Sequence, residues 1–281
     1  MKVPLRLLNR KAPGSDGLPG EFYIHFWDVL GVDLVQVFNF CFSAGFLTRS
    51  QRRGAISLTF KKGDRLDPGN WRPISLLNLD YKIASRAIAG RLLKVIPLVV
   101  HCDQSSGVLG RFIGDTVALL RDFVNYATSA NVPVALLSLD QEKAFHRVDW
   151  RLLRSVLVHM GFGPSFVGWV ELFYLGIYGA VKVNGYLTHF FKLSRALRQG
   201  CRPFCMSYTQ RSELVVFGRI LGFGACCCPG RRLPCLRCLS TLMISLWLLL
   251  LPMPSKAVFD TNAVFASGSG SRLNQVKSKG L

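Results

Sequence analysis

Acidic residues are scarce in this sequence. Its 281 residues include 16 Asp+Glu against 35 Lys+Arg, which gives a formal net charge of +19 at pH 7. Such an excess of cations disfavours a basic partner and favours a polyanionic one, nucleic acid first and an anionic membrane second. A basic protein without any polyanionic partner remains the alternative at this point. Because 50% of the residues are hydrophobic, a disordered tail is excluded and a sizeable core is expected.

A secretory start and a long membrane run are also missing. The first residues, MKVPLRLLNRKAPGSDG, contain no apolar segment followed by a cleavage-like site. We therefore expect an intracellular protein, cytoplasmic or nuclear, without a signal peptide. The longest apolar run, Leu239–Leu251, is closed by Pro252 and falls short of the roughly 20 residues that a spanning helix needs. A membrane is accordingly the minor alternative as a partner.

Cysteine is distributed unevenly along the chain. Seven of the nine cysteines follow residue 200, and an odd number without a signal peptide predicts free thiols in a reducing compartment. Cys235-x-x-Cys238 has the spacing of half a zinc site. Neither a histidine nor a second well-spaced pair completes a tetrahedral set, so zinc is not expected.

The first half of the chain alternates between helical patterns and one basic hairpin. Two helical patterns end at Gly31 and Gly45, and a third, from Lys82, ends before Pro97. Between them, two strand-like runs separated by the polar loop GDRLDPGN predict an antiparallel hairpin over residues 55–79. It would present Lys61, Lys62, Arg65 and Arg72 near one another, either as a phosphate clamp or as a solvated basic turn.

The stretch VALLSLDQEKAFHRVDW, residues 134–150, combines a buried strand with two aspartates. Asp140 stands at the C-terminal end of the strand, and Asp149 precedes the next helical pattern, whose N-cap we expect it to be. A carboxylate at the end of a core strand is typical of a metal or substrate site. It is equally typical of a turn or helix cap, so the stretch alone leaves both interpretations open.

Beyond this stretch, Asn184-Gly185 is the strongest short hairpin signal in the chain. It leads into SRALRQGC, a basic turn. Residues 202–255 then hold one acidic residue, Glu213, with poor periodicity of either type. No aspartate occurs between Asp149 and Asp260.

Taken together, these pieces resemble the reverse transcriptase domain of a non-LTR (LINE-type) retrotransposon polyprotein, in a truncated and degenerate copy. The resemblance covers residues 12–201 and 256–281. The matching segments occur in the family's order: APGSDGLPGEFY, LTFKKGD, NWRPISLLNLDYKIASRAIAGRL, DQSSGVLGRFIGD, LSLDQEKAF, VNGYLTHFFKLSRALRQGC and SGSRLNQVKSKGL.

The resemblance implies an α+β, right-hand polymerase fold: fingers made of helices and a basic hairpin, and a palm on an antiparallel sheet. We expect an incomplete palm and no thumb. The implied regions are residues 1–130, fingers-like with the hairpin at 55–79; 131–201, palm-like; 202–255, an aberrant Cys/Leu/Arg-rich segment; and 256–281, an end-of-palm remnant.

The resemblance also implies roles for individual residues. Asp140 matches the catalytic, metal-binding aspartate that comes first in the palm, and Phe145 resembles the aromatic gate that crowds a ribose 2′-OH. Lys61 and Arg72 resemble the finger residues on the incoming triphosphate. The remaining matches are Gln199 and Gly200 beside template and primer, and Lys277 or Lys279 as the late palm lysine.

The implied reaction is RNA-directed DNA synthesis with Mg²⁺ as metal, an RNA template and a DNA primer, and no small-molecule cofactor. Nucleotidyl transfer of this kind uses two divalent cations that neutralise charge on the attacking and leaving oxygens. Magnesium prefers carboxylates together with phosphate oxygens as ligands.

One departure decides the functional expectation. The family carries a further pair of adjacent aspartates on a hairpin after the RQG motif, and here that segment has none. A shift of reading frame across residues 202–255, later restored, is our hypothesis for this loss. His146 also stands where the family usually has aspartate. We therefore expect a catalytically defective polymerase domain; the alternative is a non-catalytic basic remnant that binds RNA or DNA.

Overall fold

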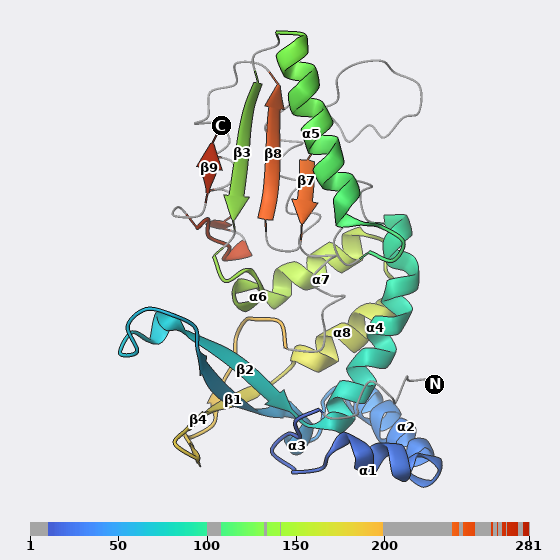
Figure 1. Cartoon of the computed structure of the whole chain (residues 1–281). Helices are drawn as coiled ribbons and strands as arrows, with labels where there is room; N and C mark the ends of the chain where they lie inside the picture. Colours follow the sequence, from blue (N-terminus) through green and yellow to red (C-terminus); the bar gives the residue numbers. More distant parts are fainter. Residues whose placement is uncertain are drawn as a thin grey trace. The chain divides into compact units, whose positions relative to one another are not determined.

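A computed structural model describes the chain over the following residues: 11–99, 108–131, 134–140, 142–198, 238–241, 244–250, 260, 263, 266–267, 269–274 and 278–280 (Figure 1). These fall into two compact units. The first comprises residues 1–91 and 157–202, and the second residues 92–156 and 203–281. The four regions drawn from the sequence remain a prediction.

The first unit begins with a helical subdomain. Its elements are α1 (Gly20–His25), α2 (Trp27–Ala44), α3 (Arg49–Arg52), the first part of α4 (Leu79–Val99) and α8 (Pro164–Tyr174). Helix α2 ends as predicted at Gly45, whose φ of 77° is left-handed. The predicted stop at Gly31 is wrong because this residue lies inside α2; a glycine weakens a helix by about 1 kcal/mol, too little to end it.

The predicted stop before Pro97 is also wrong. Helix α4 contains Pro97 and runs on to Val99. A proline removes one backbone hydrogen bond and crowds the preceding turn. Here the helix ends two residues later, so the disruption is confined to its last turn.

Aromatic contacts hold the helices of the first unit together. The Tyr81 and Phe173 rings meet edge to face with centroids 5.3 Å apart, and the Tyr81 hydroxyl donates to the Phe173 carbonyl at 3.1 Å. Phe42 on α2 stacks on Trp169 of α8 at 4.5 Å. Tyr81 and Phe173 are both fully buried, so α4 and α8 form the centre of this core.

The sheet of the first unit has the order β2-β1-β4-β5, with β6 also paired to β4. Its strands are β1 (Arg53–Phe60), β2 (Trp71–Leu77), β4 (Tyr178–Val183), β5 (Tyr186–Leu187) and β6 (Phe191–Lys192). Figure 1 shows β1, β2 and β4 of this sheet. Strands β1 and β2 form the antiparallel hairpin that the sequence predicts over residues 55–79, with pairing that starts one residue earlier, at Gly54. Asn184 and Gly185 have φ values of 50° and 87° and join β4 to β5, as a tight hairpin turn requires.

The second unit is built on an antiparallel sheet of order β7-β8-β3-β9. Its elements are α5 (Ile113–Ser129), β3 (Val134–Asp140), α6 (Ala144–Arg147), most of α7 (Trp150–His159), β7 (Cys238–Thr241), β8 (Ile244–Leu250) and β9 (Lys279–Gly280). Asp149 caps α7 as predicted, because its Oδ1 accepts the Arg151 N–H at 2.8 Å.

The described parts of the segment 202–255 form strands that its sequence does not predict. This segment shows no strand periodicity, yet it supplies β7 and β8, and β8 pairs with β3 along its whole length. The apolar run that raised the membrane alternative therefore contains a strand. Among the residues that the structure describes, no helix is long and apolar enough to cross a membrane.

Candidate nucleotide and nucleic-acid site

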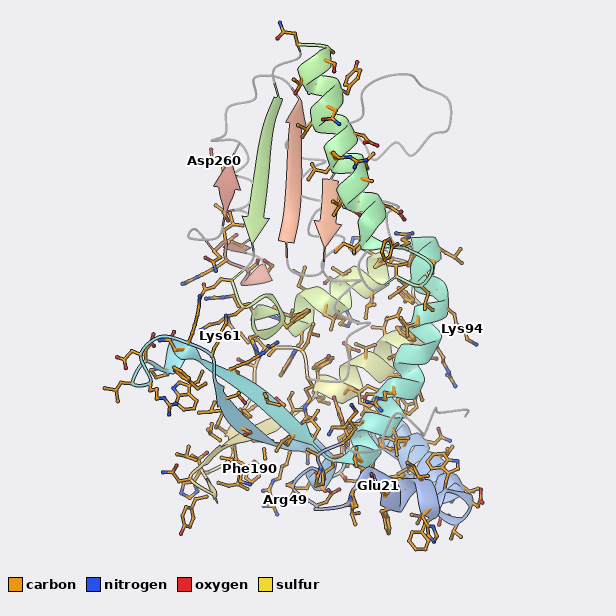
Figure 2. The ribbon with its side chains drawn as sticks, viewed as in Figure 1. Glu21, Arg49, Lys61, Lys94, Phe190 and Asp260 are labelled. Carbon is orange, nitrogen blue, oxygen red and sulfur yellow. The ribbon has the colours of Figure 1, made fainter. Side chains whose placement is uncertain are left out.

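The tip of the β1–β2 hairpin brings together two of the predicted site residues. Arg72 pairs with Thr59, and the Lys61 N–H donates to the Asn70 carbonyl at 2.9 Å, which extends the ladder by one residue. Because side chains alternate along a strand, Lys61, Thr59 and Arg72 lie on one face. Lys61 and Arg72 are exposed, and Figure 2 shows Lys61 at the free end of the hairpin.

The opposite face of the tip is aromatic. Phe60 and Trp71 pack edge to face with centroids 5.4 Å apart, and the Arg65 guanidinium lies 4.9 Å from the centre of the Phe60 ring. The Trp71 indole N–H donates to the Arg65 carbonyl at 2.9 Å. Arg65, which we expected near Lys61 and Arg72, therefore lies on the other face, where stacking on Phe60 holds it.

The loop at the tip is ordered by its own carboxylates. Asp64 Oδ1 accepts the Leu66 N–H at 2.9 Å, and Asp67 Oδ1 accepts the Gly69 N–H at 2.7 Å. In such turns the carboxylate accepts a hydrogen bond from a backbone N–H of its own loop. The face that carries Lys61, Thr59 and Arg72 is called the polar face below. It adjoins a loop whose conformation is fixed by its own hydrogen bonds.

At the base of the hairpin stands Arg198, which the sequence reasoning did not single out. Its side chain is 5% exposed, and its guanidinium donates to the carbonyls of Gln51 at 3.2 Å and Arg52 at 3.1 Å. The same group lies 4.5 Å from the centre of the Tyr81 ring. The sequence signal was its place directly before Gln199 and Gly200, which lie outside the described residues.

A buried polar cluster supports the same junction. The Asp80 carboxylate accepts the Gln51 Nε2 at 2.9 Å and the Tyr81 N–H at 2.6 Å. Burial raises the pKa of Asp80, against the lowering effect of the Gln51 hydrogen bond. Burial also raises the pKa of Tyr23, with the Asp80 charge as a second cause. These groups anchor α3 to α4.

The palm-like sheet places several of the other predicted residues. Asp140 ends β3 and pairs with Ile244 of β8, while Ser138 pairs with Lys279 of β9. The backbone of Lys279 therefore lies on the strand next to β3, close to the Asp140 end; Lys277 lies outside the described residues. Phe145 follows on α6 and is half-buried.

The described strands that flank β3 supply no second carboxylate beside Asp140. Strands β7 and β8 contain neither Asp nor Glu. Within the described part of the chain, no group of three or more His, Cys, Asp or Glu side chains is arranged to hold a metal ion. Two divalent cations in one site require more than one carboxylate. Among the described strands of this sheet, Asp140 is therefore the one acidic residue.

A family model for "Reverse transcriptase (RNA-dependent DNA polymerase)" matches residues 60–204. The chain belongs to the reverse transcriptase family. It is 47% identical over 198 residues to the transposon TX1 uncharacterized 149 kDa protein of Xenopus laevis, covering 70% of this chain and 15% of that protein. It is 25% identical over 181 residues to the retrovirus-related Pol polyprotein from the type-1 retrotransposable element R1 of Bradysia coprophila, covering 62% and 18% respectively.

These relatives confirm that the reverse transcriptase domain is of the non-LTR, LINE type. The chain spans less than a fifth of the length of either relative. What the whole proteins do is therefore not carried over to it directly.

Solved structures show the same fold. Apo telomerase from Candida tropicalis, truncated from its C-terminal domain, matches with a TM-score of 0.60 at 12% identity, covering 96% of this chain and 58% of that one. Telomerase from the same organism in complex with a fragment of telomeric RNA matches with a TM-score of 0.59 at 11% identity, covering 94% and 45%. At such identities the likeness concerns the fold alone, and it confirms the predicted α+β fingers-and-palm class.

Proposed function

We propose that this chain is a reverse transcriptase domain that binds nucleic acid through its basic surface but is catalytically defective in RNA-directed DNA synthesis. The observation that carries the proposal is the register of the palm-like sheet. Asp140 pairs with Ile244 on β8, and the β7–β8 hairpin contains no acidic residue. In the family, the hairpin after the RQG motif carries the second pair of aspartates.

The loss of that pair has a large expected effect on the rate. The metal ions orient the primer 3′-OH and neutralise the charge that develops on the transferring phosphate. Electrostatic stabilisation of this kind usually contributes more to catalysis than any other single effect. With Asp140 as the single carboxylate at this end of the paired strands, Mg²⁺ retention and hence incorporation should fall by many orders of magnitude.

The remaining roles follow from the same proposal. Lys61 is a point charge and Arg72 a bidentate donor, so together they suit a phosphate group. Phe145 would stand at the ribose, and Gln199 and Gly200 beside the template and primer. Lys277 or Lys279 would be the late palm lysine. RNA template and DNA primer are the partners that this assignment requires.

Primer extension on an RNA template with Mg²⁺ tests the catalytic part. We expect no incorporation above that of the Asp140→Asn variant. Incorporation by the wild-type chain that Asp140→Asn abolishes would show an active centre and overturn the proposal.

The binding part needs a separate measurement. Affinity for a single-stranded homopolymer RNA should fall steeply with salt, since neutralised phosphates release counterions. An undetectable or salt-independent interaction would contradict it. Binding without extension on any template or with any metal is the result that the proposal expects, and the alternative of a non-catalytic basic remnant predicts the same result.

A further inference from the structure

The polar face of the first unit's sheet extends beyond the hairpin tip. Ser57 of β1 pairs with Ile74 of β2 on one side and with Lys182 of β4 on the other. Paired residues share a face, and so do residues two apart on one strand. Lys182 consequently shares the face that carries Lys61, Thr59 and Arg72.

The chemistry of this face suits a polyanion. Lys61, Arg72 and Lys182 are all exposed, and the hydroxyls of Thr59 and Ser57 stand between them. No acidic residue occurs in any strand of this sheet. A phosphate group on the strands of this face would therefore meet cations and hydroxyl donors. The carboxylates of the tip loop, Asp64 and Asp67, each accept a backbone N–H of that loop.

The spacing of the cations distinguishes between phosphate-bearing ligands. Lys182 lies one strand across and four residues along from Lys61, which places their Cα atoms about 14 Å apart. Lys61 and Arg72 are diagonal neighbours on the hairpin, about 7 Å apart. One triphosphate could contact both Lys61 and Arg72. A ligand that also contacts Lys182 must carry successive phosphates along a chain.

Lys182 is also held in place. It is part of β4, which pairs with β1 on one side and β5 on the other. The neighbouring Val181 N–H donates to Thr188 Oγ1 at 2.9 Å, and the Thr188 N–H donates to the Val181 carbonyl at 3.0 Å. The backbone under this cation is thus fixed before any ligand binds, which lowers the entropic penalty of binding.

We propose that Lys182 is a binding residue for the phosphate backbone of single-stranded nucleic acid, which crosses the sheet from the Lys61 and Arg72 tip toward β4. This inference rests on the nucleic-acid binding in the proposed function. It adds a strand outside the β1–β2 hairpin to the contact surface. A macromolecule with spaced phosphates fits the face better than an acidic peptide, because arginine and hydroxyl donors match phosphate oxygens along a regular chain.

Binding of the whole chain to a uridine homopolymer of about 12 nucleotides tests the proposal. The measurement is the slope of log affinity against log salt between about 50 and 200 mM, which changes by roughly 0.7 for each phosphate contact on a single strand. We expect Lys182→Ala to lower the slope magnitude by about 0.7. Lys94→Ala is the matched control, because Lys94 is exposed on α4 and does not belong to this sheet.

A second ligand, inorganic triphosphate, separates the two phosphate sources. Lys61→Ala and Arg72→Ala should weaken its binding, whereas Lys182→Ala should not. Equal slopes for the wild type and Lys182→Ala, with the wild type still binding, would overturn this inference alone. Equal losses for Lys182→Ala and Lys94→Ala would also overturn it, since net charge would then explain the effect. No binding by the wild type would overturn the proposed function as well.

Discussion

Replacing Arg198 by methionine should destabilise the first unit more than any surface substitution near it. The guanidinium is 5% exposed and donates to two main-chain carbonyls, those of Gln51 and Arg52, at 3.2 and 3.1 Å. It also lies over the Tyr81 ring at 4.5 Å. Arg198→Met keeps the length and the contact with the ring but removes both hydrogen bonds and the charge.

The magnitude follows from opposing effects. Each hydrogen bond from a charged donor is worth about 1.5–3 kcal/mol, and the cation over the ring adds about 0.5–2 kcal/mol. Removing a buried cation also recovers part of its desolvation penalty, which reaches several kcal/mol. The net loss should be about 3 kcal/mol, or roughly a 150-fold change in the folding equilibrium.

Equilibrium urea unfolding followed by circular dichroism measures this loss. Arg198→Lys should fall between the wild type and Arg198→Met, because an ammonium cannot span both carbonyls with a planar fork. Arg195→Met is the control: Arg195 is exposed in the same segment, and surface substitutions usually stay within about 0.5 kcal/mol. An Arg198→Met midpoint equal to that of Arg195→Met would refute the reasoning, since the two carbonyl bonds would then contribute nothing net.

Three further predictions concern local features. Asp149→Ala should lower the unfolding free energy by about 1 kcal/mol because α7 loses its cap; urea unfolding checks this, and an unchanged midpoint contradicts it. Ala196 has a φ of 90°, so Ala196→Gly should raise the unfolding free energy by about 0.5–1 kcal/mol, whereas Ala180→Gly, at a buried strand position, should lower it. Burial raises the pKa of Asp80 above its ordinary 3.8, so the folded state binds this proton more tightly than the unfolded state. The stabilisation is present at low pH and lost as pH rises through the folded pKa; Asp80→Asn should flatten this dependence, and parallel pH profiles would contradict it.

Local chemistry made the hairpins predictable from the sequence. The turn at Asn184-Gly185 needs two residues that tolerate positive φ, and both adopt it. The GDRLDPGN loop closes the β1–β2 hairpin with Asp64 and Asp67 as turn acceptors. In each case the residues that set the conformation are adjacent in the chain, so a short window of sequence contains the whole cause.

Long-range pairing was not predictable in the same way. The parallel pairing of β1 with β4 joins Arg53 to Tyr178, and nothing in either strand specifies the other. Arg198 is another example, since its partners Gln51 and Arg52 are far away in sequence. A buried arginine with carbonyl partners cannot be told from an exposed one by its neighbours in the chain.

The β7–β8 hairpin explains how, under our proposal, this chain can keep the fold of its family without the family's chemistry. A ladder with β3 is formed by backbone N–H and C=O groups, which every residue except proline supplies. Apolar residues such as those of Ile244–Leu250 can therefore form the paired strand. The pairing does not depend on carboxylates at the end of that strand. The cations on the sheet of the first unit attract phosphate without any contribution from the palm-like sheet. A reverse transcriptase fold that has lost its acidic pair should therefore lose metal-dependent synthesis first and nucleic-acid binding last. Ile244→Asp would place a second carboxylate opposite Asp140 in the register of the sheet. Tighter Mn²⁺ binding that Asp140→Asn cancels is the expected result, and unchanged Mn²⁺ binding would contradict the proposal that a missing carboxylate limits metal retention.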